Sequence, residues 1–383
     1  MIRLPSAGCT RRRAGRRLGA ALLLLGLVAP AIAEDAGEAS GQTWPGDTTD
    51  LVFLWEDADS TNQIIGPDGR RGATCRVTAR GLAHYGRHHN MVLTGDAAFR
   101  AEDADADLLA AAQRTGELTL EALITPANLD PAGYARIISF ANADDTGNFT
   151  LSQKGNQLWF RLRTTATGDD EPPAFALAEL EAGRTHHVII SYRQGRLNAY
   201  IDGEHRATSE DANGHGDLLS NWNEQRLLFG DDRPGEPGWA GRLEGVALFA
   251  RAVDSEEAAH RHQLARDRLA DRKPAARFVV KAKRVETSAV PTPDDIAPYR
   301  RALVTHTYTL QAAHEGSFDH ARFQVAHWAI MDTTPIKRTF DLGEAETLHL
   351  ERFDAHPQLM SERLISDSDE FDLPLFIDVG PVQ

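Results

Sequence analysis

Apolar and polar positions alternate in short runs over most of the chain after residue 115. In residues 117–124 every second side chain is apolar, which is the period of a β-strand with one face in a core. Turn residues at 154–156, 194–195 and 202–203 stand between such runs and predict hairpins. Short strands separated by turns at this density predict an all-β fold, either a two-sheet sandwich or a jelly roll.

One helical pattern interrupts the strands. Residues 255–272 contain no Gly or Pro, Asp254 can cap the first turn with Glu257 three positions on, and Pro274 ends the run. Further strand-like runs then predict a smaller β-rich domain over residues 274–383. The alternation at 303–310 and 323–330 resembles a small closed barrel of the oligonucleotide/oligosaccharide-binding type.

Seven strand-like or turn-containing segments follow one another in order, at 117–126, 136–139, 148–151, 157–163, 186–188, 198–203 and 239–254. Together they resemble the LamG-like jelly rolls of the concanavalin A-like lectin/glucanase superfamily. The resemblance covers about residues 48–262, with Leu123 standing where an aromatic residue is common. It implies two antiparallel sheets packed face to face, usually in a binding module, often for carbohydrate and sometimes with calcium at one rim. Some relatives are glycoside hydrolases or lyases, so the fold alone does not decide the function.

The first 33 residues have the composition of a secretory signal. They hold six arginines and no acid, followed by the apolar run 18–33 and the small-x-small site Ala31-Ile32-Ala33. We therefore expect a signal peptide over 1–33, a linker over 34–47, the jelly roll over 48–254, a closing helix and linker over 255–273 and the small domain over 274–383. The expected location is periplasmic or extracellular, with no membrane insertion after cleavage; an uncleaved anchor is the alternative.

The net charge excludes some classes of binding partner, and the cysteine content excludes an intramolecular disulfide. The whole chain has a net charge of −15, and without residues 1–33 it holds 35 basic and 56 acidic residues, or −21. Such an acidic body argues against nucleic acid and against docking on an anionic membrane. Only Cys75 remains after signal cleavage, so no intramolecular disulfide can form, and we interpret it as a small buried apolar residue.

Aromatic residues in polar loops are the candidates for carbohydrate contact, because sugar rings present apolar C–H faces and hydroxyls. Trp222, expected to be exposed, is the leading candidate, whereas Trp239 lies in the family-like segment and is expected to pack in the core. The candidate ligand-binding residues are Asn221, Trp222, Asn223, Glu224 and Trp239.

Calcium is a candidate cofactor, and no other cofactor is expected. It takes six to eight oxygen ligands, and two loops are rich in carboxylates and amides, although solvated acidic turns are the commoner explanation for such loops. The candidate calcium ligands are Asn142, Asp144, Asp145, Asp231 and Asp232.

The sequence supports catalysis and a zinc site less well than it supports carbohydrate binding. Glu117-x-Thr119-x-Glu121 resembles the Glu-x-Asp-x-Glu strand of the superfamily's endoglucanases, but Thr119 replaces the central acid, and a structural role is favoured. His187 is interpreted as a core histidine. His306 and His327 can meet if their strands pair, as hydrogen-bonded core residues or as part of a zinc site.

The sequence thus predicts a secreted, non-catalytic envelope protein that binds polysaccharide through the jelly roll. A protein-binding scaffold of a polysaccharide export or assembly complex, and a hydrolase or lyase on the same fold, remain alternatives.

Overall fold

The computed structural model describes residues 43–56, 63–65, 71–95, 97–142, 147–168, 171–210, 218–231, 233 and 238–380. The chain divides into two compact units, residues 1–41 and 42–383, and every described residue belongs to the second. The expected signal peptide lies outside the described residues. Within them, no helix is both long enough and apolar enough to cross a membrane.

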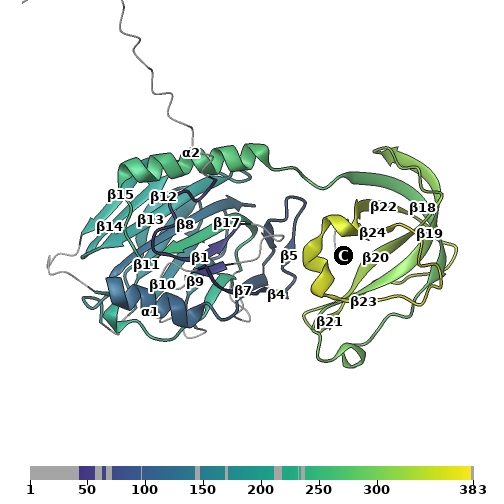
Figure 1. Cartoon of the computed structure of the whole chain (residues 1–383), viewed down its shortest axis with the longest axis horizontal. Coiled ribbons are helices and arrows are strands. Elements are labelled where there is room, and N and C mark those ends of the chain that lie inside the picture. Colours follow the sequence, from purple (N-terminus) through teal and green to yellow (C-terminus); the bar gives the residue numbers. More distant parts are fainter. Residues whose placement is uncertain are drawn as a thin grey trace, which may run out of the picture. The chain divides into compact units, whose positions relative to one another are not determined.

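The larger domain is a sandwich of two antiparallel sheets, as the alternation predicted (Figure 1). Sheet A has ten strands, with β15-β14-β13-β8-β17-β1-β2-β3 in order and β6 pairing with β17 and β5. Its strands are β1 (Leu51–Trp55), β2 (Gln63–Ile65), β3 (Arg71–Thr74), β5 (His84–Tyr85), β6 (Met91–Leu93), β8 (Glu117–Pro126), β13 (His186–Arg193), β14 (Arg196–Ile201), β15 (Glu204–Glu210) and β17 (Gly241–Phe249).

Sheet B has seven strands in the order β12-β11-β10-β9-β16-β7-β4. The three predicted hairpins form, since Lys154 pairs with Gln157, Arg193 with Arg196 and Ile201 with Glu204. The strands of sheet B are β4 (Val77–Gly81), β7 (Ala97–Ala101), β9 (Ala135–Phe140), β10 (Phe149–Lys154), β11 (Gln157–Leu162), β12 (Phe175–Glu179) and β16 (Leu227–Gly230).

The main core fills the space between the two sheets. The rings of Phe53 from sheet A and Phe229 from sheet B lie 5.7 Å apart. Cys75 is buried at its edge, as predicted, and burial raises the pKa of the thiol to about 12, which makes it a poor nucleophile.

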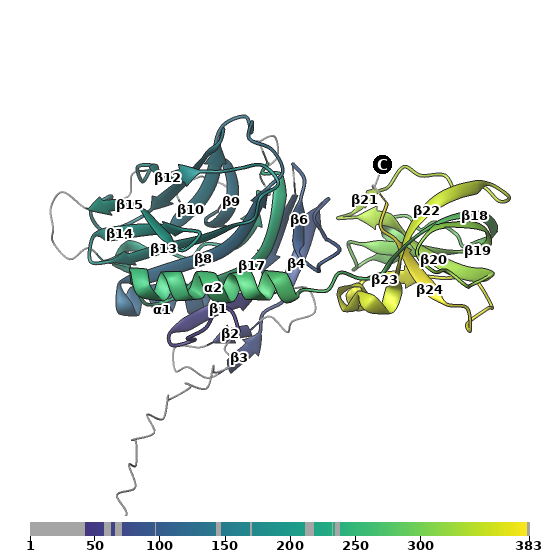
Figure 2. The same ribbon diagram turned by 90° about the horizontal axis from the view of Figure 1, so that it is seen from above.

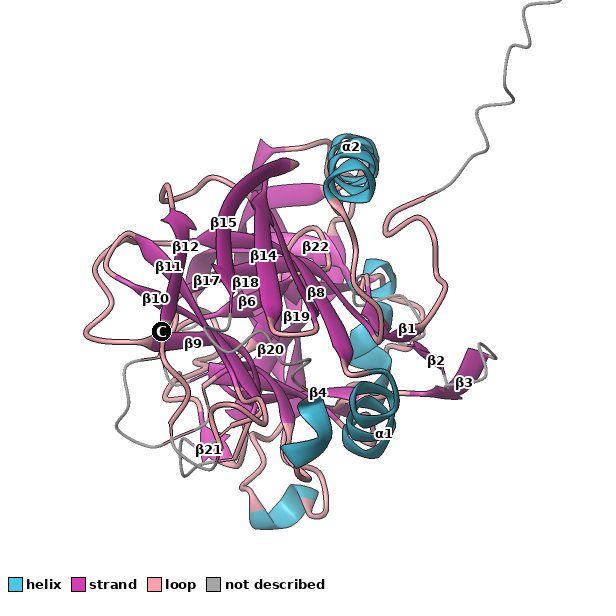
Figure 3. Cartoon of the chain, turned by 90° about the vertical axis from the view of Figure 1, so that its left-hand side faces the viewer, coloured by secondary structure: helices cyan, strands magenta, loops and turns pink. Residues whose placement is uncertain are grey.

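Two α-helices lie outside the sheets (Figure 3). α2 (Ser255–Asp271) is the predicted helix, and the Asp254 side chain accepts a hydrogen bond from the Glu257 backbone N–H as expected of its cap. It packs on the outer face of sheet A through Ala265. α1 (Asp105–Thr115), which the alternation did not predict, lies beside the short 3₁₀ helix η1 (Leu219–Asn221).

The C-terminal domain is a closed β-barrel. β20 pairs with both β24 and β19, which closes the ring β20-β24-β22-β18-β19, and β21 and β23 add at its edges. Its strands are β18 (Arg277–Thr287), β19 (Ala302–Glu315), β20 (Arg322–Met331), β21 (Thr334–Pro335), β22 (Ala345–Arg352), β23 (Arg363–Ile365) and β24 (Leu375–Asp378), with 3₁₀ helices η2 (Asp294–Ile296), η3 (Phe353–Ala355) and η4 (Pro357–Ser361).

A polar cluster is buried inside this barrel. β19 and β20 pair, and the rings of His306 and His327 lie 5.6 Å apart, as the pairing predicts. His327 Nε2 lies 3.1 Å from the Tyr308 hydroxyl and Nδ1 lies 3.3 Å from Asp378 Oδ2, so it is a hydrogen-bonded core histidine. His306 Nδ1 accepts from the Ser288 N–H at 3.3 Å.

Burial of this cluster makes the barrel sensitive to acid. Desolvation is the main cause that lowers the pKa of His306 to about 3, helped by His327 and the guanidinium groups of Arg284 and Arg338. The unfolded chain keeps a histidine pKa near 6.5, so between about pH 6.5 and 3 the unfolded state binds the additional proton. The free energy of unfolding should therefore fall as the pH falls through this range.

We predict that His306→Asn, whose side-chain oxygen can still accept from the Ser288 N–H, loses stability less steeply between pH 7 and pH 4 than the wild type. Urea unfolding at a series of pH values measures both slopes. Asp378, whose pKa is also lowered, titrates in both proteins and cancels from the comparison. Equal slopes would show that His306 does not contribute.

Candidate functional site

Trp222 is not an exposed aromatic, and this expectation is wrong. Its side chain is 3% exposed, packs 5.9 Å from the ring of Phe140 and 6.0 Å from that of Phe149, and its Nε1 donates to the Arg163 carbonyl at 2.8 Å. η1 turns the chain so that Trp222 closes one end of the sandwich core. The indole therefore has no face left for a ligand.

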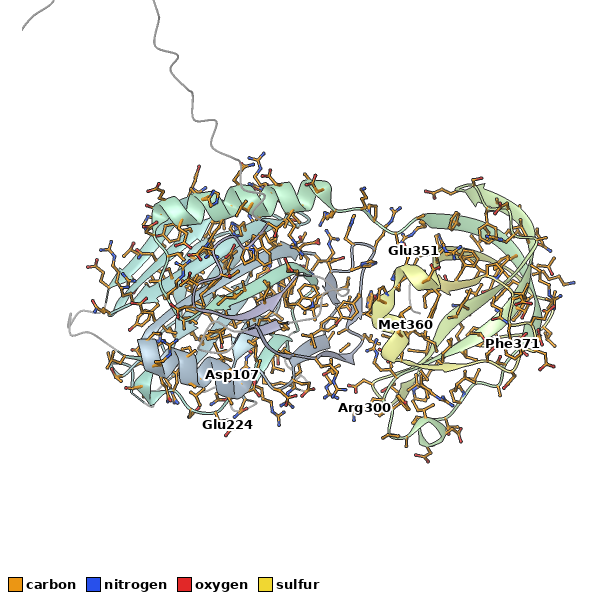
Figure 4. The ribbon with its side chains drawn as sticks, in the orientation of Figure 1. Asp107, Glu224, Arg300, Glu351, Met360 and Phe371 are labelled. Atoms are coloured by element: carbon orange, nitrogen blue, oxygen red, sulfur yellow. The ribbon has the colours of Figure 1, made fainter. Side chains whose placement is uncertain are left out.

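The neighbouring candidates divide between core and surface. Trp239 is buried, as expected, and its Nε1 donates to Gln153 Oε1 at 2.7 Å. The Asn221 amide donates to the Thr164 carbonyl at 2.8 Å, which ties the loop to its neighbour. Asn223 and Glu224 are exposed, and Glu224 lies on the surface below α1 in Figure 4. The set therefore does not form one surface around an aromatic ring.

The calcium candidates are only partly described. Asp144, Asp145 and Asp232 lie outside the described residues. Asp231 is buried against Arg233, whose Nη2 lies 2.7 Å from its Oδ2, and the Asn142 carbonyl accepts from Arg136 at 3.3 Å. In the described part of the chain, no group of three or more His, Cys, Asp or Glu side chains is placed to hold a metal ion. Calcium binding stays a prediction.

The outer face of sheet A holds the two candidate catalytic acids. Glu121 is fully buried under α2, where it accepts from Arg261 Nη1 at 2.8 Å and Trp44 Nε1 at 2.6 Å and contacts His187 Nε2 at 2.8 Å. Glu117 accepts from Arg193 Nε at 2.7 Å and from the Ala252 N–H at 2.8 Å. The core role expected of His187 fits this arrangement, and both acids serve as anchors of the fold.

The outer face of sheet B carries a different set of residues. Leu158, Phe160 and Leu162 of β11 point into the core, so the alternation of the strand puts Trp159 and Arg161 on the opposite face. Sequence reasoning missed these residues, although a tryptophan among polar positions in the outward phase of the strand is a usable signal.

These two side chains join two others in what we call the aromatic–cationic cluster, made of Tyr134, Lys154, Trp159 and Arg161. The rings of Tyr134 and Trp159 lie 5.7 Å apart in an edge-to-face arrangement. Lys154 Nζ lies 4.5 Å and Arg161 Cζ 4.7 Å from the centre of the Tyr134 ring. Cations at this distance are attracted by the electron-rich ring faces, so the cluster is held together before any ligand arrives.

Donors at this face lack acceptors. Among the described residues, Trp159 Nε1, Arg161 Nε and the Ser139 hydroxyl have no hydrogen-bond partner although each atom is buried. Arg161 Nη1 does reach the exposed Glu171 at 2.6 Å. A buried donor without an acceptor costs about 1–3 kcal/mol. The donors at this face that are open to a ligand belong to the exposed Lys154 and the partly exposed Arg161. The face therefore combines apolar rings with accessible cationic donors.

The sandwich matches a known family. Residues 94–259 match the family model described as the concanavalin A-like lectin/glucanases superfamily. The match assigns residues 94–259 of the sandwich, less than half of the chain, to that superfamily. The match spans both sheets and includes the aromatic–cationic cluster. No curated protein matches the chain.

Solved structures with a similar course of the chain come from different settings. Domain 4 of a GH43 extracellular arabinanase from Geobacillus stearothermophilus, in complex with arabinotriose, is 14% identical with a TM-score of 0.39, over 56% of this chain and 98% of that one. A Trypanosoma rangeli sialidase mutant with trans-sialidase activity is 16% identical with a TM-score of 0.41, over 58% and 34%, about a third of its length. The binding domain of botulinum neurotoxin DC in complex with rat synaptotagmin II is 11% identical with a TM-score of 0.43, over 79% and 74%. Likeness at this level does not extend to what this chain binds.

The burial of Trp222 leads to a prediction about stability. Trp222→Ala should destabilise the sandwich by about 3–5 kcal/mol, the usual cost of removing a large buried aromatic side chain. The midpoint of urea unfolding measures this loss. Glu224→Ala, in the same loop but exposed, should change stability by less than about 0.5 kcal/mol. Near-equal midpoints for the two variants would contradict the buried position of Trp222.

Proposed function

We propose that this protein is a non-catalytic carbohydrate-binding protein that holds polysaccharide at the outer face of sheet B. The aromatic–cationic cluster carries the proposal, because it places apolar ring surface beside the accessible cationic donors of Lys154 and Arg161. Sugars match this combination, with apolar C–H faces for the rings and hydroxyl oxygens for the donors. Membership of a superfamily of lectins and glucanases supports a glycan as the ligand.

The course of the sheets favours this face over the other one. α2 covers the middle of sheet A, and Figure 2 shows the helix lying along β8 and β13, whereas β9, β10 and β12 lie on the far side of the sandwich from it. No α-helix of the described chain packs on the cluster, so a long glycan chain can lie across the strands.

Binding is favoured over hydrolysis by the state of the two candidate acids. A retaining or inverting glycosidase needs one carboxyl group to donate a proton and a second to act as nucleophile or base, both facing the substrate. Glu121 instead faces Arg261 under α2, and Glu117 accepts from Arg193 and a backbone N–H. These contacts support a structural role for both.

Glycan retention tests the proposal. Trp159→Ala should weaken binding by about 1–3 kcal/mol, the range of a hot-spot aromatic residue, with little effect on folding because the ring lies on the outer face. Affinity electrophoresis in gels that contain arabinan, dextran, alginate or polygalacturonate measures the retardation. Phe371→Ala is the matched control, because Phe371 is an exposed aromatic residue of the barrel, 86% accessible.

Three outcomes would contradict the proposal. Retardation by none of the glycans would favour a protein-binding scaffold, and equal retardation of the wild type and Trp159→Ala would move the site elsewhere. Release of reducing ends by the wild-type protein, lost in Glu117→Gln, would show a hydrolase.

We further propose that the protein is exported, because residues 1–33 combine an arginine-rich start, an apolar run and Ala31-Ile32-Ala33. Amino-terminal sequencing of the protein from the envelope and medium should give Glu34 as the first residue. An intact amino terminus in the membrane fraction would show an uncleaved anchor instead.

A further inference from the structure

A pocket lies in the unit 42–383, apart from the aromatic–cationic cluster, between the β4–β5 region and the barrel. It encloses about 420 Å³, within the range of sites for small molecules. Its barrel wall includes the apolar side chains of Trp328, Met331, Leu359 and Ile377, and its opposite wall includes Tyr85. Both walls belong to one compact unit.

Arg301 is the unusual residue of this pocket. It stands directly before β19, is only 7% exposed, and its guanidinium lies 4.6 Å from the centre of the Trp328 ring. Among the described residues, its Nε and Nη1 atoms have no hydrogen-bond partner. Glu362 Oε1 lies 3.3 Å from Nε and offsets the charge without an aligned hydrogen bond.

The other charged groups that line the pocket lie within ion-pair distance of a partner, although Glu351 Oε2 and His356 Nε2, like Arg301 Nε, make no aligned hydrogen bond. Glu351, labelled in Figure 4, is fully buried and accepts from Arg277 Nη2 at 2.8 Å, and its Oε2 lies 3.0 Å from His356 Nε2. Asp378 accepts from Arg338 at 3.0 Å. Of the three arginines that line the pocket, Arg301 is the most buried, and it has two buried nitrogens without an acceptor among the described residues.

We infer that this pocket binds a compact organic carboxylate, whose charged head accepts from Arg301 and whose apolar body lies against Trp328, Leu359 and Ile377. Hydrogen bonds between a guanidinium and a carboxylate are about twice as strong as bonds between neutral groups. Burial is the main cause that lowers the pKa of Arg301, and it also raises the pKa of Glu362, so both charges are held at a cost. A bound anion would offset the desolvation of the Arg301 guanidinium, and it would compete with the Glu362 carboxylate for that group.

Calorimetric titration of the full chain at pH 7 tests the site with hexanoate and benzoate as probes, against hexanamide and benzamide. The carboxylates should bind at least about tenfold more tightly than the amides of the same shape, as expected for a charge-assisted hydrogen bond. Arg301→Met, which keeps apolar contact with Trp328, should weaken carboxylate binding by at least the same factor. Arg352→Met, at an exposed arginine paired with Asp354, is the matched control and should bind like the wild type.

Glu362→Gln should change the affinity for carboxylates in the direction opposite to Arg301→Met. It removes the competing negative charge, so carboxylate binding should tighten several-fold, and this variant keeps the test decisive if Arg301→Met fails to fold. Absence of carboxylate binding up to 10 mM probe (about the weakest affinity of interest), equal binding of acids and amides, or no change in Glu362→Gln would each overturn the inference. Trp159→Ala should leave these titrations unchanged, which separates this site from the glycan face.

Discussion

The buried carboxylate of Glu121 is the constraint around which the sandwich is arranged. A charge with no exposure to water is tolerated only when partners surround it, and removing one partner of such a group usually costs about 3–5 kcal/mol. Glu121 takes its partners from three separate parts of the chain, Trp44 before β1, His187 on β13 and Arg261 on α2. Glu121 on β8 therefore holds together the amino-terminal end of the described chain, strand β13 and the closing helix α2.

Because α2 is held against sheet A, the outer faces of the two sheets differ in how far they are covered. Sheet A is covered on its inner face by the main core and on its outer face by α2, with Leu123 and Phe249 packed against Ala265. A strand buried on both faces carries apolar residues in nearly every position, and the run Ala122-Leu123-Ile124 has that character. Sheet B keeps alternation, with Leu158 and Phe160 inside and Trp159 and Arg161 outside. A binding surface with polar and aromatic residues is therefore to be sought on sheet B.

The sequence predicted well what local chemistry decides. The hairpins follow from Gly155, Gly195 and Gly203, which all adopt positive φ, and α2 follows from its Asp254 cap. α1 was missed although it offers signals, with Asp105 and Asp107 in the first turn and Gly116 in the left-handed conformation at its end. Ala104 precedes the helix and provides no side-chain cap, so the capping signal that marks α2 is absent there.

The sequence could not predict the burial or the contacts of side chains whose neighbours come from distant parts of the chain. Trp222 has polar neighbours on both sides, and only the arrival of Phe140 and Phe149 at the end of the sandwich makes its burial favourable. The aromatic–cationic cluster likewise needs β9, β10 and β11 to lie side by side before Tyr134 meets Lys154 and Arg161. The meeting of His306 and His327 was predictable because a single strand pairing suffices for it.

Two buried arginines, Arg261 and Arg284, have hydrogen-bond acceptors for all the nitrogens of their guanidinium groups. Arg261 donates from Nε, Nη1 and Nη2 to Glu257, Glu121 and the Asp47 carbonyl. Arg284, inside the barrel, donates to the Tyr308 hydroxyl, the Asp341 carbonyl and Glu346.

Arg301 is also buried, at 7% exposure against 1% for Arg261 and Arg284, yet two of its three nitrogens lack an acceptor in the described chain. Buried donors are usually satisfied in native proteins, so two such nitrogens on one guanidinium that lines a cavity call for an explanation. A residue kept in this state beside a cavity of about 420 Å³ is better explained by a ligand than by the stability of the barrel, since an apolar residue stacked on Trp328 would pack there without that cost.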